Sequence, residues 1–373
     1  MIEIEQKSKC ADLFAGAGGF SQAALNSGFE VSFAVEFDHH AATTYRNNIV
    51  PQSNALKFYE QDIRSINFDD IRARVFDVEG GCDLILGGPP CQGYSSHRIN
   101  NSGVGDERND LIHSYFDCVE ALNPTAFLME NVPGMLWPRH AEYISEFYSR
   151  GEASGYFIYQ PVVLDARDFG VPQRRKRVFI LGVKSDSERS SLVWPPSKTH
   201  CKGADSSEIG LQPWKSCAFA FEPAPHGDPN DAHMNHGSEL ISAFKRTPKN
   251  GGSRRDSGRV LPCHDGHDGH KDVYGRIDSQ QPAPTMTTAC INPSKGRFVH
   301  PTEHHGITVR QAARIQTFPD NYVFSGGLTA AGKQVGNAVP VKLGEAILKA
   351  LKPFLDQARS DRFQRSVSEL ENV

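Results

Sequence analysis

A glycine-rich turn near the N-terminus most constrains what this chain can fold into. Lys9–Phe14 has the apolar character of a short strand, Ala15–Gly19 supplies three glycines, and residues from about Phe20 to Ser27 favour a helix. This order opens a nucleotide-binding α/β unit, because glycines let backbone N–H groups and the helix N-terminus approach a ligand closely. A tight turn without a ligand would have the same sequence, so the turn alone assigns no function.

Further predicted strands end in acidic residues. The pairs are Val31–Val35 with Glu36, Lys57–Gln61 with Asp62, and Thr125–Met129 with Glu130. Because the carboxyl ends of parallel strands meet at one crevice, we expect these acids to line a ligand-binding edge. Glu36 follows the glycines by 17 to 20 residues, about where such units carry a ribose-binding carboxylate. The alternative for each acid alone is a cap on the following helix.

A cysteine follows the next predicted strand. Cys82–Leu86 is apolar, Gly87–Pro90 ends the strand abruptly, and Cys91 comes next, before a polar loop that extends from Gln92 to Asp110. A thiol just past the carboxyl end of a strand is well placed to be a nucleophile. Most cysteines are small buried residues instead, so the rest of the chain must decide between the two interpretations.

Basic residues mark two later segments. In Gln173–Arg177, alternation along an extended chain would place Arg175 and Arg177 on one face, and a solvated strand edge is the alternative. From about Ser185 to Asp272 the chain is rich in Gly, Pro, His, Asn and Ser and loses regular apolar periodicity. A basic run there includes Arg254 and Arg255, which suits phosphate and base-edge contacts, although a solvated loop would look similar.

A dense group of cysteine and histidine residues lies within this irregular region. Residues 263–270, Cys-His-Asp-Gly-His-Asp-Gly-His, contain the side-chain types that bind zinc. Their spacing matches no standard zinc-finger pattern, and the Gly-Asp alternation favours a tight polar loop. We therefore predict no metal.

Charge and apolar content limit the partners and the compartment. The 40 Lys and Arg residues against 44 Asp and Glu give a formal charge of -4, so nucleic-acid binding would need a local basic face. No apolar stretch is long enough for a bilayer, and the N-terminal residues lack the pattern of a signal peptide. Eight scattered cysteines in a chain of this size indicate free thiols. We expect a cytoplasmic protein with no membrane partner.

Five short motifs give the chain a specific resemblance. They are Phe14–Gly19, Pro89–Gln92, Glu130–Val132, Gln173–Arg177 and Gly332–Pro340, in this order. With them the chain resembles the cytosine-5 DNA methyltransferase family, bacterial type, over residues 9 to about 184 and about 272 to 345. The resemblance implies an α/β fold: a Rossmann-like S-adenosylmethionine-dependent methyltransferase domain with a smaller, irregular target-recognition domain. We expect residues 1–188 to begin the catalytic domain, 189–329 to form the small domain, and 330–373 to return to the catalytic domain.

The resemblance also implies roles for individual residues. Cys91 would be the nucleophile, Glu130 would bind the edge of the cytosine, Arg177 would hold its O2 atom, and Arg175 would support the loop or the thiolate. The cofactor would be S-adenosyl-L-methionine. Its expected contacts are Phe14, Gly16, Gly18, Gly19, Glu36, Phe37, Asp62, Ile63, Pro90, Asn337 and Val339.

The expected substrate is double-stranded DNA. A cytosine inside a duplex must be flipped out to reach a buried thiol, and the loop after Cys91 is a natural lid. The expected DNA contacts are Gln92, Ser95, Arg108, Arg254 and Arg255. A cognate restriction endonuclease that acts separately is a possible partner, and we expect a monomer.

Three other functions fit parts of the sequence. One is cytosine-5 methylation of RNA, although the tRNA-directed relatives carry Pro-Pro-Cys-Gln-Pro where this chain has Gly93. Another is a catalytically silent DNA-binding regulator, against which the intact Cys91, Glu130 and Arg177 argue. The third is a nicotinamide dehydrogenase, against which the incomplete G-x-G-x-x-G motif argues.

The C-terminal region is expected to complete the first domain. A helix from about Val341 to Leu355 has apolar residues at 3-4 spacing, namely Leu343, Ala346, Ile347, Ala350 and Leu351. We expect this face to pack beside the first strand and its glycine turn. The charged tail beyond Leu355 is expected to be a loose helix or frayed.

Overall fold

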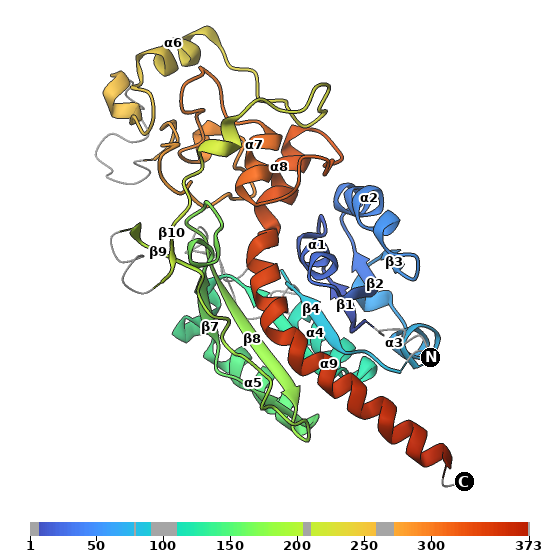
Figure 1. Ribbon diagram of the computed structural model, residues 1–373. Coiled ribbons are helices and arrows are strands. Elements are labelled where there is room, and N and C mark those ends of the chain that lie inside the picture. Colours follow the sequence, from blue (N-terminus) through green and yellow to red (C-terminus); the bar gives the residue numbers. More distant parts are fainter. Residues whose placement is uncertain (1–6, 78–79, 91–109, 204–209, 259–271, 372–373) are drawn as a thin grey trace. The chain divides into compact units, whose positions relative to one another are not determined.

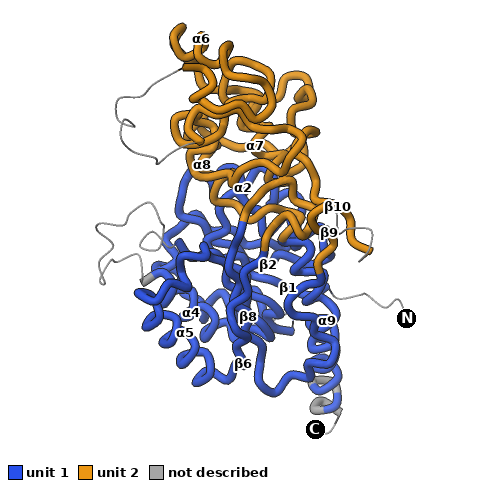
Figure 2. The backbone as a smooth tube through the Cα atoms, turned by 90° about the vertical axis from the view of Figure 1, so that its left-hand side faces the viewer, with its two compact units in different colours: residues 1–164, 176–197, 344–373 blue, residues 165–175, 198–343 orange. Residues whose placement is uncertain are grey.

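The computed structural model describes residues 7–77, 80–90, 110–203, 210–258 and 272–371. The chain divides into two compact units (Figure 2). Unit 1 comprises residues 1–164, 176–197 and 344–373, and unit 2 comprises residues 165–175 and 198–343. These geometric bounds differ from the predicted 189–329 for the small domain and place residues 330–343 in unit 2. The functional division into a catalytic and a target-recognition domain stays a prediction.

Unit 1 alternates strands and helices (Figure 1). Its strands are β1 (Lys9–Leu13), β2 (Glu30–Glu36), β3 (Lys57–Glu60), β4 (Leu84–Gly87), β5 (Ala126–Asn131), β6 (Tyr156–Ile158), β7 (Val162–Asp165, whose last residue is assigned to unit 2) and β8 (Lys176–Lys184). Its helices are α1 (Gly19–Asn26), α2 (His39–Asn48), α3 (Phe68–Ile71), α4 (Asp110–Leu122), α5 (Ala141–Ala153) and most of α9 (Val341–Glu371).

All eight strands belong to one mixed sheet. Its order is β3-β2-β1-β4-β5-β8-β6, with β7 paired to β8. The strands β1 to β5 run parallel, and β8 is antiparallel to both β5 and β6. The five parallel strands therefore end at one edge, and β8 begins at that same edge. The predicted α/β class is confirmed.

Side-chain alternation along β1 shows how the sheet separates two layers. Ala11 and Leu13 join the apolar cluster that includes residues of α3, α4 and α5. Asp12 points to the opposite face, where its Oδ2 accepts a hydrogen bond of 2.6 Å from Ser21 in α1. At the centre of the cluster, Phe127 makes edge-to-face contacts with several rings, including Phe116. Burial of this face is the main force that holds the unit together.

Helix α9 extends much farther than expected. It continues to Glu371, so the tail beyond Leu355 is helical, the first of the two expected forms, and its Arg359 is buried at 6% exposure. Its contacts include Glu345 with Asn26 and Asp356 with Ser8, which adjoins β1. The buried apolar residues of this helix are Val341, Leu343, Ile347, Leu348, Leu351, Phe354 and Leu355. The predicted face was thus partly wrong, because Ala346 and Ala350 are only half-buried.

Unit 2 has little regular structure. Its described elements are β9 (His200–Cys201), β10 (Gln212–Pro213), α6 (Ser238–Arg246), α7 (Val309–Ile315) and α8 (Leu328–Asn337). Irregular backbone leaves carbonyl groups without ladder partners, and these groups need donors when they are buried. Buried arginines supply such donors here: Arg276 donates to the carbonyl oxygens of Phe244, Thr247, His300 and Glu303.

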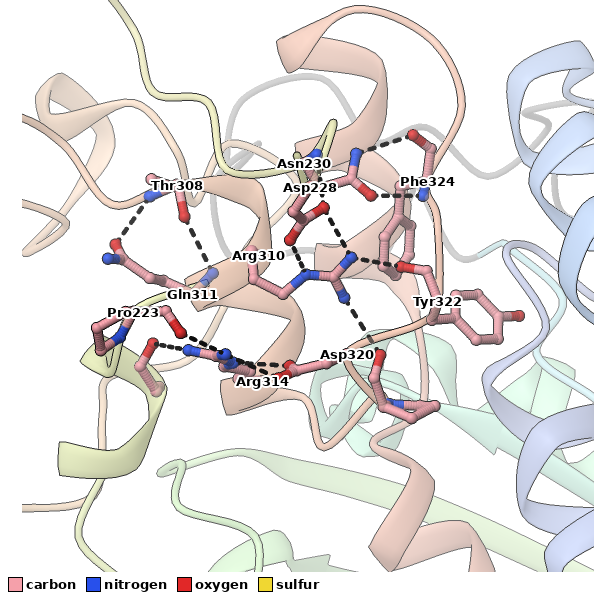
Figure 3. Close-up of polar contacts among 12 residues, drawn as sticks. Pro223, Asp228, Asn230, Thr308, Arg310, Gln311, Arg314, Asp320, Tyr322 and Phe324 are labelled. Atoms are coloured by element: carbon pink, nitrogen blue, oxygen red, sulfur yellow. Dashed lines mark hydrogen bonds and ion pairs between the residues drawn. The ribbon is translucent and has the colours of Figure 1, made fainter. Parts of the chain in front are cut away.

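Two arginines of α7 perform the same task (Figure 3). Arg310 donates to both carboxylate oxygens of Asp228 and to the carbonyl oxygen of Tyr322, at 2.9 Å for the latter. Arg314 pairs with Asp320 at 2.7 Å and donates to the carbonyl oxygen of Pro223 at 3.2 Å. Five donors in a planar fork allow one side chain to bind several loop segments at once. Helix α7 is thereby the anchor of the surrounding loops.

Candidate active site

The glycine turn after β1 adopts the conformation that its sequence requires. Phe14, Gly16 and Gly18 have positive φ values of 55°, 57° and 88°, and Gly18 is the N-cap of α1. Glycine reaches such values without steric cost, whereas Phe14 is held there against its preference. The turn brings the N–H of Gly16 to the carboxylate Oε2 of Glu36, at 2.7 Å. The structure therefore joins two of the predicted cofactor residues.

Glu36 occupies the end of β2, beside this turn. Its Oε1 accepts a second backbone hydrogen bond, from the N–H of Asp38 at 2.7 Å. Burial raises the pKa of Glu36, and the two backbone donors oppose that shift. The next residue, Phe37, exposes 73% of its surface. A half-buried carboxylate beside an exposed aromatic ring forms a surface that can both accept hydrogen bonds and stack against a flat ring.

The end of β3 carries Asp62 and Ile63. The Asp62 carboxylate pairs with Arg64 at 2.6 Å and caps a short 3-10 turn through the N–H of Arg64. This partner lowers the pKa of Asp62. Ile63 is buried at 4% exposure and belongs to the apolar cluster of the sheet. Arg64 therefore already engages both oxygens of the predicted adenine-binding acid.

Glycines at the end of β4 allow a close approach of neighbouring groups. A side chain at Gly87 would meet the ring of Tyr115 at 2.7 Å, and one at Gly88 would lie 3.0 Å from Oε2 of Glu130. The side-chain amide of Asn131 donates to the carbonyl oxygen of Pro89 at 3.2 Å. This bond ties β5 to the chain two residues before Cys91. Asn131 lies within the Glu130–Val132 motif, but the motif predicted no role for it. The contact by which it positions Pro89 was therefore not predicted.

Glu130 and Arg177 meet at the ends of β5 and β8. The guanidinium Nε lies 2.9 Å from Oε1 of Glu130, and the two side chains expose only 11% and 14% of their surface. The antiparallel register, which pairs Glu130 with Phe179 and Asn131 with Val178, brings Arg177 beside the end of β5. Burial lowers the pKa of Arg177, and the Glu130 charge opposes that shift. The pair is a desolvated acid and cation at the edge where the parallel strands end.

Arg175 has a different environment. It precedes β8, and its fully buried guanidinium donates to the carbonyl oxygens of Met286, Gly336 and Ala338 at 2.9 to 3.0 Å. Gln316 adds amide bonds to the carbonyl oxygens of Val335 and Ala338. The predicted shared face with Arg177 rested on strand alternation, which does not extend to Arg175 because the strand begins at Lys176.

These bonds fix the backbone around Asn337, within unit 2. The Asn337 side chain is exposed, whereas Val339 is 6% exposed. At Gly336 a side chain would collide with the backbone of Thr287 at 2.0 Å, so only glycine permits this packing. Buried donors thus hold the carbonyl groups on both sides of Asn337 and leave its side chain at the surface.

The remaining predicted site residues fall into two groups: some are described by the structure, and the others lie outside the described residues. Arg254 is buried at 6% exposure in a short 3-10 turn, and Arg255 is exposed. Cys91, Gln92, Ser95, Arg108 and the cysteine- and histidine-rich residues 263–270 lie outside the described residues, and Pro90 is half-buried at the boundary. Across the described ranges, no group of three or more His, Cys, Asp or Glu residues could hold a metal, and no helix could span a membrane.

The parallel strands β1 to β5, with a glycine turn after β1, form a Rossmann-like nucleotide-binding framework. The buried Glu130–Arg177 pair lies at the edge where these strands end. The chain belongs to the C-5 cytosine-specific DNA methylase family, which matches residues 8–353. It is therefore a DNA (cytosine-5-)-methyltransferase, and the activity expected from the five motifs is confirmed.

Bacterial type II methyltransferases are similar over nearly the whole chain. M1.HphI of Haemophilus parahaemolyticus is 33% identical over 342 residues, which cover 91% of this chain and 85% of the relative. M.NgoFVII of Neisseria gonorrhoeae is 31% identical over 360 residues, which cover 96% and 89%. The predicted resemblance to bacterial cytosine-5 DNA methyltransferases is confirmed, and these relatives are type II methyltransferases.

Solved structures share the fold. A DNA modification methyltransferase encoded within an Escherichia coli prophage gives a TM-score of 0.70 at 24% identity, with 94% of this chain and 100% of that chain covered. The Schizosaccharomyces pombe Dnmt2 methyltransferase gives 0.57 at 16% identity, with 93% and 99% covered. At these identities the likeness establishes the fold and nothing further.

Proposed function

We propose that this methyltransferase takes its methyl group from S-adenosylmethionine and transfers it to C5 of a flipped cytosine in duplex DNA, through a covalent adduct of Cys91. The buried Glu130–Arg177 pair, with a separation of 2.9 Å, is the observation that carries the proposal. The Asn131 amide, bound to the Pro89 carbonyl, supports it by tying the segment that leads to Cys91 to the same strand end. A nucleophile beside a desolvated acid suits addition to a pyrimidine ring.

The glycine turn and Glu36 fit the proposed cofactor. A carboxylate has about four lone-pair sites, and backbone N–H groups of Gly16 and Asp38 occupy two on Glu36. Phe37 contributes a further backbone hydrogen bond to this carboxylate, so the lone-pair site that remains would accept from a ribose hydroxyl group. The exposed ring of Phe37 offers a face to the adenine. A side chain at Gly16 would meet only the Phe14 carbonyl oxygen, at 4.0 Å, so there is open space beside this glycine. Gly16, Gly18 and Gly19 are the proposed contacts of the methionine portion. When bound, S-adenosylmethionine supplies an electrophilic methyl group on a sulfonium.

The other proposed cofactor contacts come from three further segments. Asp62 would accept the adenine amine while it shares its carboxylate with Arg64, and Ile63 would pack nearby. Pro90, Phe14, Asn337 and Val339 complete the proposed set. The network of Arg175 and Gln316 supports the inclusion of Asn337, because it fixes the backbone and leaves that side chain exposed.

The proposed chemistry assigns each group one task. The Cys91 thiolate would add to C6 and move the C5=C6 electron pair onto C5. This carbon would then be nucleophilic enough to accept the methyl group that bound S-adenosylmethionine would supply, with the sulfonium leaving as the neutral thioether. Glu130, protonated or sharing a proton, would hydrogen-bond N3 as negative charge develops, and Arg177 would bind O2 and orient Glu130. Loss of the C5 proton to a base then restores C5=C6 and expels the thiolate.

We further propose that residues 189–329 select the DNA sequence, and that Gln92, Ser95, Arg108, Arg254 and Arg255 contact the duplex. Arg254 is buried, so its participation requires the 3-10 turn Arg254–Ser257 to open toward DNA. A restriction endonuclease specific for the same sequence would act as a separate protein. We propose a cytoplasmic monomer.

One assay tests the proposal. Purified protein is incubated with tritiated S-adenosylmethionine and either a random-sequence duplex or tRNA, and the methylated positions are mapped by sequencing. We expect label at C5 of cytosine in one short duplex sequence and none in tRNA. Label only in tRNA, or transfer to duplex DNA that Cys91→Ser leaves within about tenfold of the parent, would overturn it.

Replacement of residues 185–272 by the equivalent segment of a relative tests whether DNA sequence recognition and cofactor binding belong to different parts of the chain. We expect a change in the methylated sequence with unchanged affinity for S-adenosylhomocysteine. A loss of cofactor affinity with an unchanged target would place the boundary of the recognition region elsewhere.

A further inference from the structure

An exposed aromatic residue and an arginine lie together shortly after strand β5. Two 3-10 turns, Pro133–Leu136 and Pro138–His140, follow the strand. Leu136 and Trp137 expose 37% and 39% of their surface, and Cζ of Arg139 lies 4.8 Å from the centroid of the Trp137 ring. Adjacent apolar residues beside a stacked cation form a surface that can bind a ligand with both apolar and anionic parts.

The backbone that carries Trp137 is rigid. A proline near the start of each turn fixes φ, and the N–H groups of Met135, Trp137 and His140 all bond to carbonyl groups three residues earlier. Met135 and His140 are buried below, at 1% and 7% exposure. The turns are thus anchored from beneath while Trp137 remains at the surface. Little conformational entropy would be lost on binding, which favours a recognition role.

Arg139 is oriented by a neighbouring histidine, and no described carboxylate neutralises its charge. Its Nε donates to Nε2 of His140 at 2.9 Å. Burial, with a contribution from the Arg139 charge, lowers the pKa of His140 to about 4, so the imidazole is a neutral acceptor at pH 7. In the described part of the chain, no carboxylate forms an ion pair with Arg139. The guanidinium is therefore preorganised by Trp137 and His140 and available to an anion.

This surface lies at the edge of the sheet where the active-site pair is found. Glu130 and Asn131 end β5, and Pro133–Leu136 packs against β8, whose first residues are the exposed Lys176 and the active-site Arg177. A cytosine that reaches Glu130 must bring its flanking phosphates across this edge. The position and the chemistry of the surface both match that backbone.

We propose that Trp137 and Arg139 bind the sugar–phosphate backbone of duplex DNA next to the target cytosine. The inference rests on the proposed function, because it takes Glu130 to be at the base-binding site. The Trp137 ring would pack on a deoxyribose or an adjacent base, and the Arg139 guanidinium would bind a phosphate. Both residues position the substrate, and neither touches the reacting atoms.

The chain contains a matched control at the opposite end of the same sheet. Phe157 in β6 exposes 45% of its surface, and Cζ of Arg189 lies 4.6 Å from its ring centroid. Because Phe157 pairs with Val183 near the end of β8, this second aromatic–arginine pair lies far along the sheet from Glu130, which pairs with Phe179. The Phe157–Arg189 pair thus offers the same kinds of side chain, an exposed aromatic ring and an arginine, at a place away from the proposed base-binding site.

The experiment measures affinity for a duplex that carries the mapped target sequence, at several salt concentrations, in the full-length protein. The variants are Arg139→Met, Arg139→Lys, Trp137→Ala and Trp137→Phe, with Arg189→Met and Phe157→Ala as controls. Arg139→Met should weaken binding about tenfold and reduce the slope of log K against log salt by about 0.9, the value for one phosphate contact. Arg139→Lys should retain the slope, and Trp137→Phe should recover most of the loss caused by Trp137→Ala.

Several outcomes would overturn the inference. They are an unchanged salt slope in Arg139→Met, an equal loss in the Arg189→Met control, or an unchanged duplex affinity in Trp137→Ala. Affinity for S-adenosylhomocysteine must stay within about twofold of the parent, which separates a lost DNA contact from a misfolded unit 1. If the parent protein methylates no duplex, the proposed function fails. If the parent methylates duplex DNA normally and the Trp137 and Arg139 variants bind the duplex as the parent does, this inference alone is refuted.

Discussion

Two arginines of α9 hold a buried carboxylate at the start of β4. Arg359 Nη1 lies 2.8 Å from Asp83 Oδ2, and Arg362 pairs with Oδ1 and donates to the Thr125 hydroxyl at 2.8 Å. The Asp83 side chain is fully buried, and that of Arg359 is 7% exposed. We predict that Arg359→Met together with Arg362→Met destabilises unit 1 strongly, because the change leaves Asp83 buried with only the N–H of Lys9 as a donor among the contacts described.

The magnitude follows from the cost of an unpaired buried charge. Removing one side of a buried ion pair typically costs about 3–5 kcal/mol, whereas replacing the whole pair by apolar groups is often nearly neutral. For a domain of about 150–250 residues, each kcal/mol lowers the melting temperature by about 2–4 °C. The double variant should therefore melt roughly 6–20 °C below the parent.

Differential scanning calorimetry measures this effect. Arg365→Met is the matched control, because Arg365 lies on the same helix, is exposed and does not contact Asp83, so its melting temperature should stay within about 2 °C of the parent. Adding Asp83→Leu to the double variant should recover most of the loss, since no charge then remains buried. A double variant that melts within about 2 °C of the parent, or that Asp83→Leu fails to rescue, would refute the reasoning.

Three further predictions concern other parts of the site and of unit 2. Glu130→Gln should lower kcat for methyl transfer at least about 100-fold while S-adenosylhomocysteine affinity is retained, and transfer within about threefold of the parent would contradict the role of Glu130. His300 accepts N–H bonds at Nδ1 from Thr302 and Glu303, and burial lowers its pKa to about 4. Because the unfolded chain binds a proton with pKa about 6.5, unit 2 should be most stable above that pH and lose stability as pH falls towards 4; the melting temperature in His300→Asn should vary less over this range. Gln316→Leu should remove two carbonyl contacts beside Asn337, lower stability by about 1–3 kcal/mol in a urea titration and weaken S-adenosylhomocysteine binding, whereas unchanged cofactor affinity would remove Asn337 from the cofactor set.

Local sequence determined the parts of the fold that depend on near neighbours. The strand, glycine turn and helix at Lys9–Asn26 follow from apolar runs and from glycines that must adopt positive φ. The acids at strand ends could be assigned to one edge because parallel strands share a direction. Glu130 was therefore recognisable as a site residue before its partner was known, and Arg177 was recognisable from its motif.

Partners distant in sequence could not be predicted in this way. The tail of α9 was expected to be a loose helix or frayed because a run of charged residues normally lies in water. Arg359 is nevertheless buried beside a carboxylate 276 positions away. The surroundings of Arg175 and Arg254 could not be predicted either: the guanidinium of the first binds buried carbonyl groups, and the second is buried in a 3-10 turn. Their functional roles stay predictions. The burial of a cation depends on tertiary contacts, and sequence alone supplies only its charge.

Covalent trapping tests the central claim most directly. A random-sequence duplex containing 5-fluorocytosine is incubated with the protein and S-adenosylmethionine, resolved on a denaturing gel, and the trapped DNA is sequenced. Fluorine cannot leave C5 as a proton does, so a covalent mechanism predicts a gel-stable adduct that requires the cofactor, is absent in Cys91→Ser, and carries one common DNA sequence. An enzyme that methylates the unmodified duplex at C5 yet forms no such adduct, or a Cys91→Ser variant that forms it equally well, would contradict the assignment of Cys91 as the nucleophile.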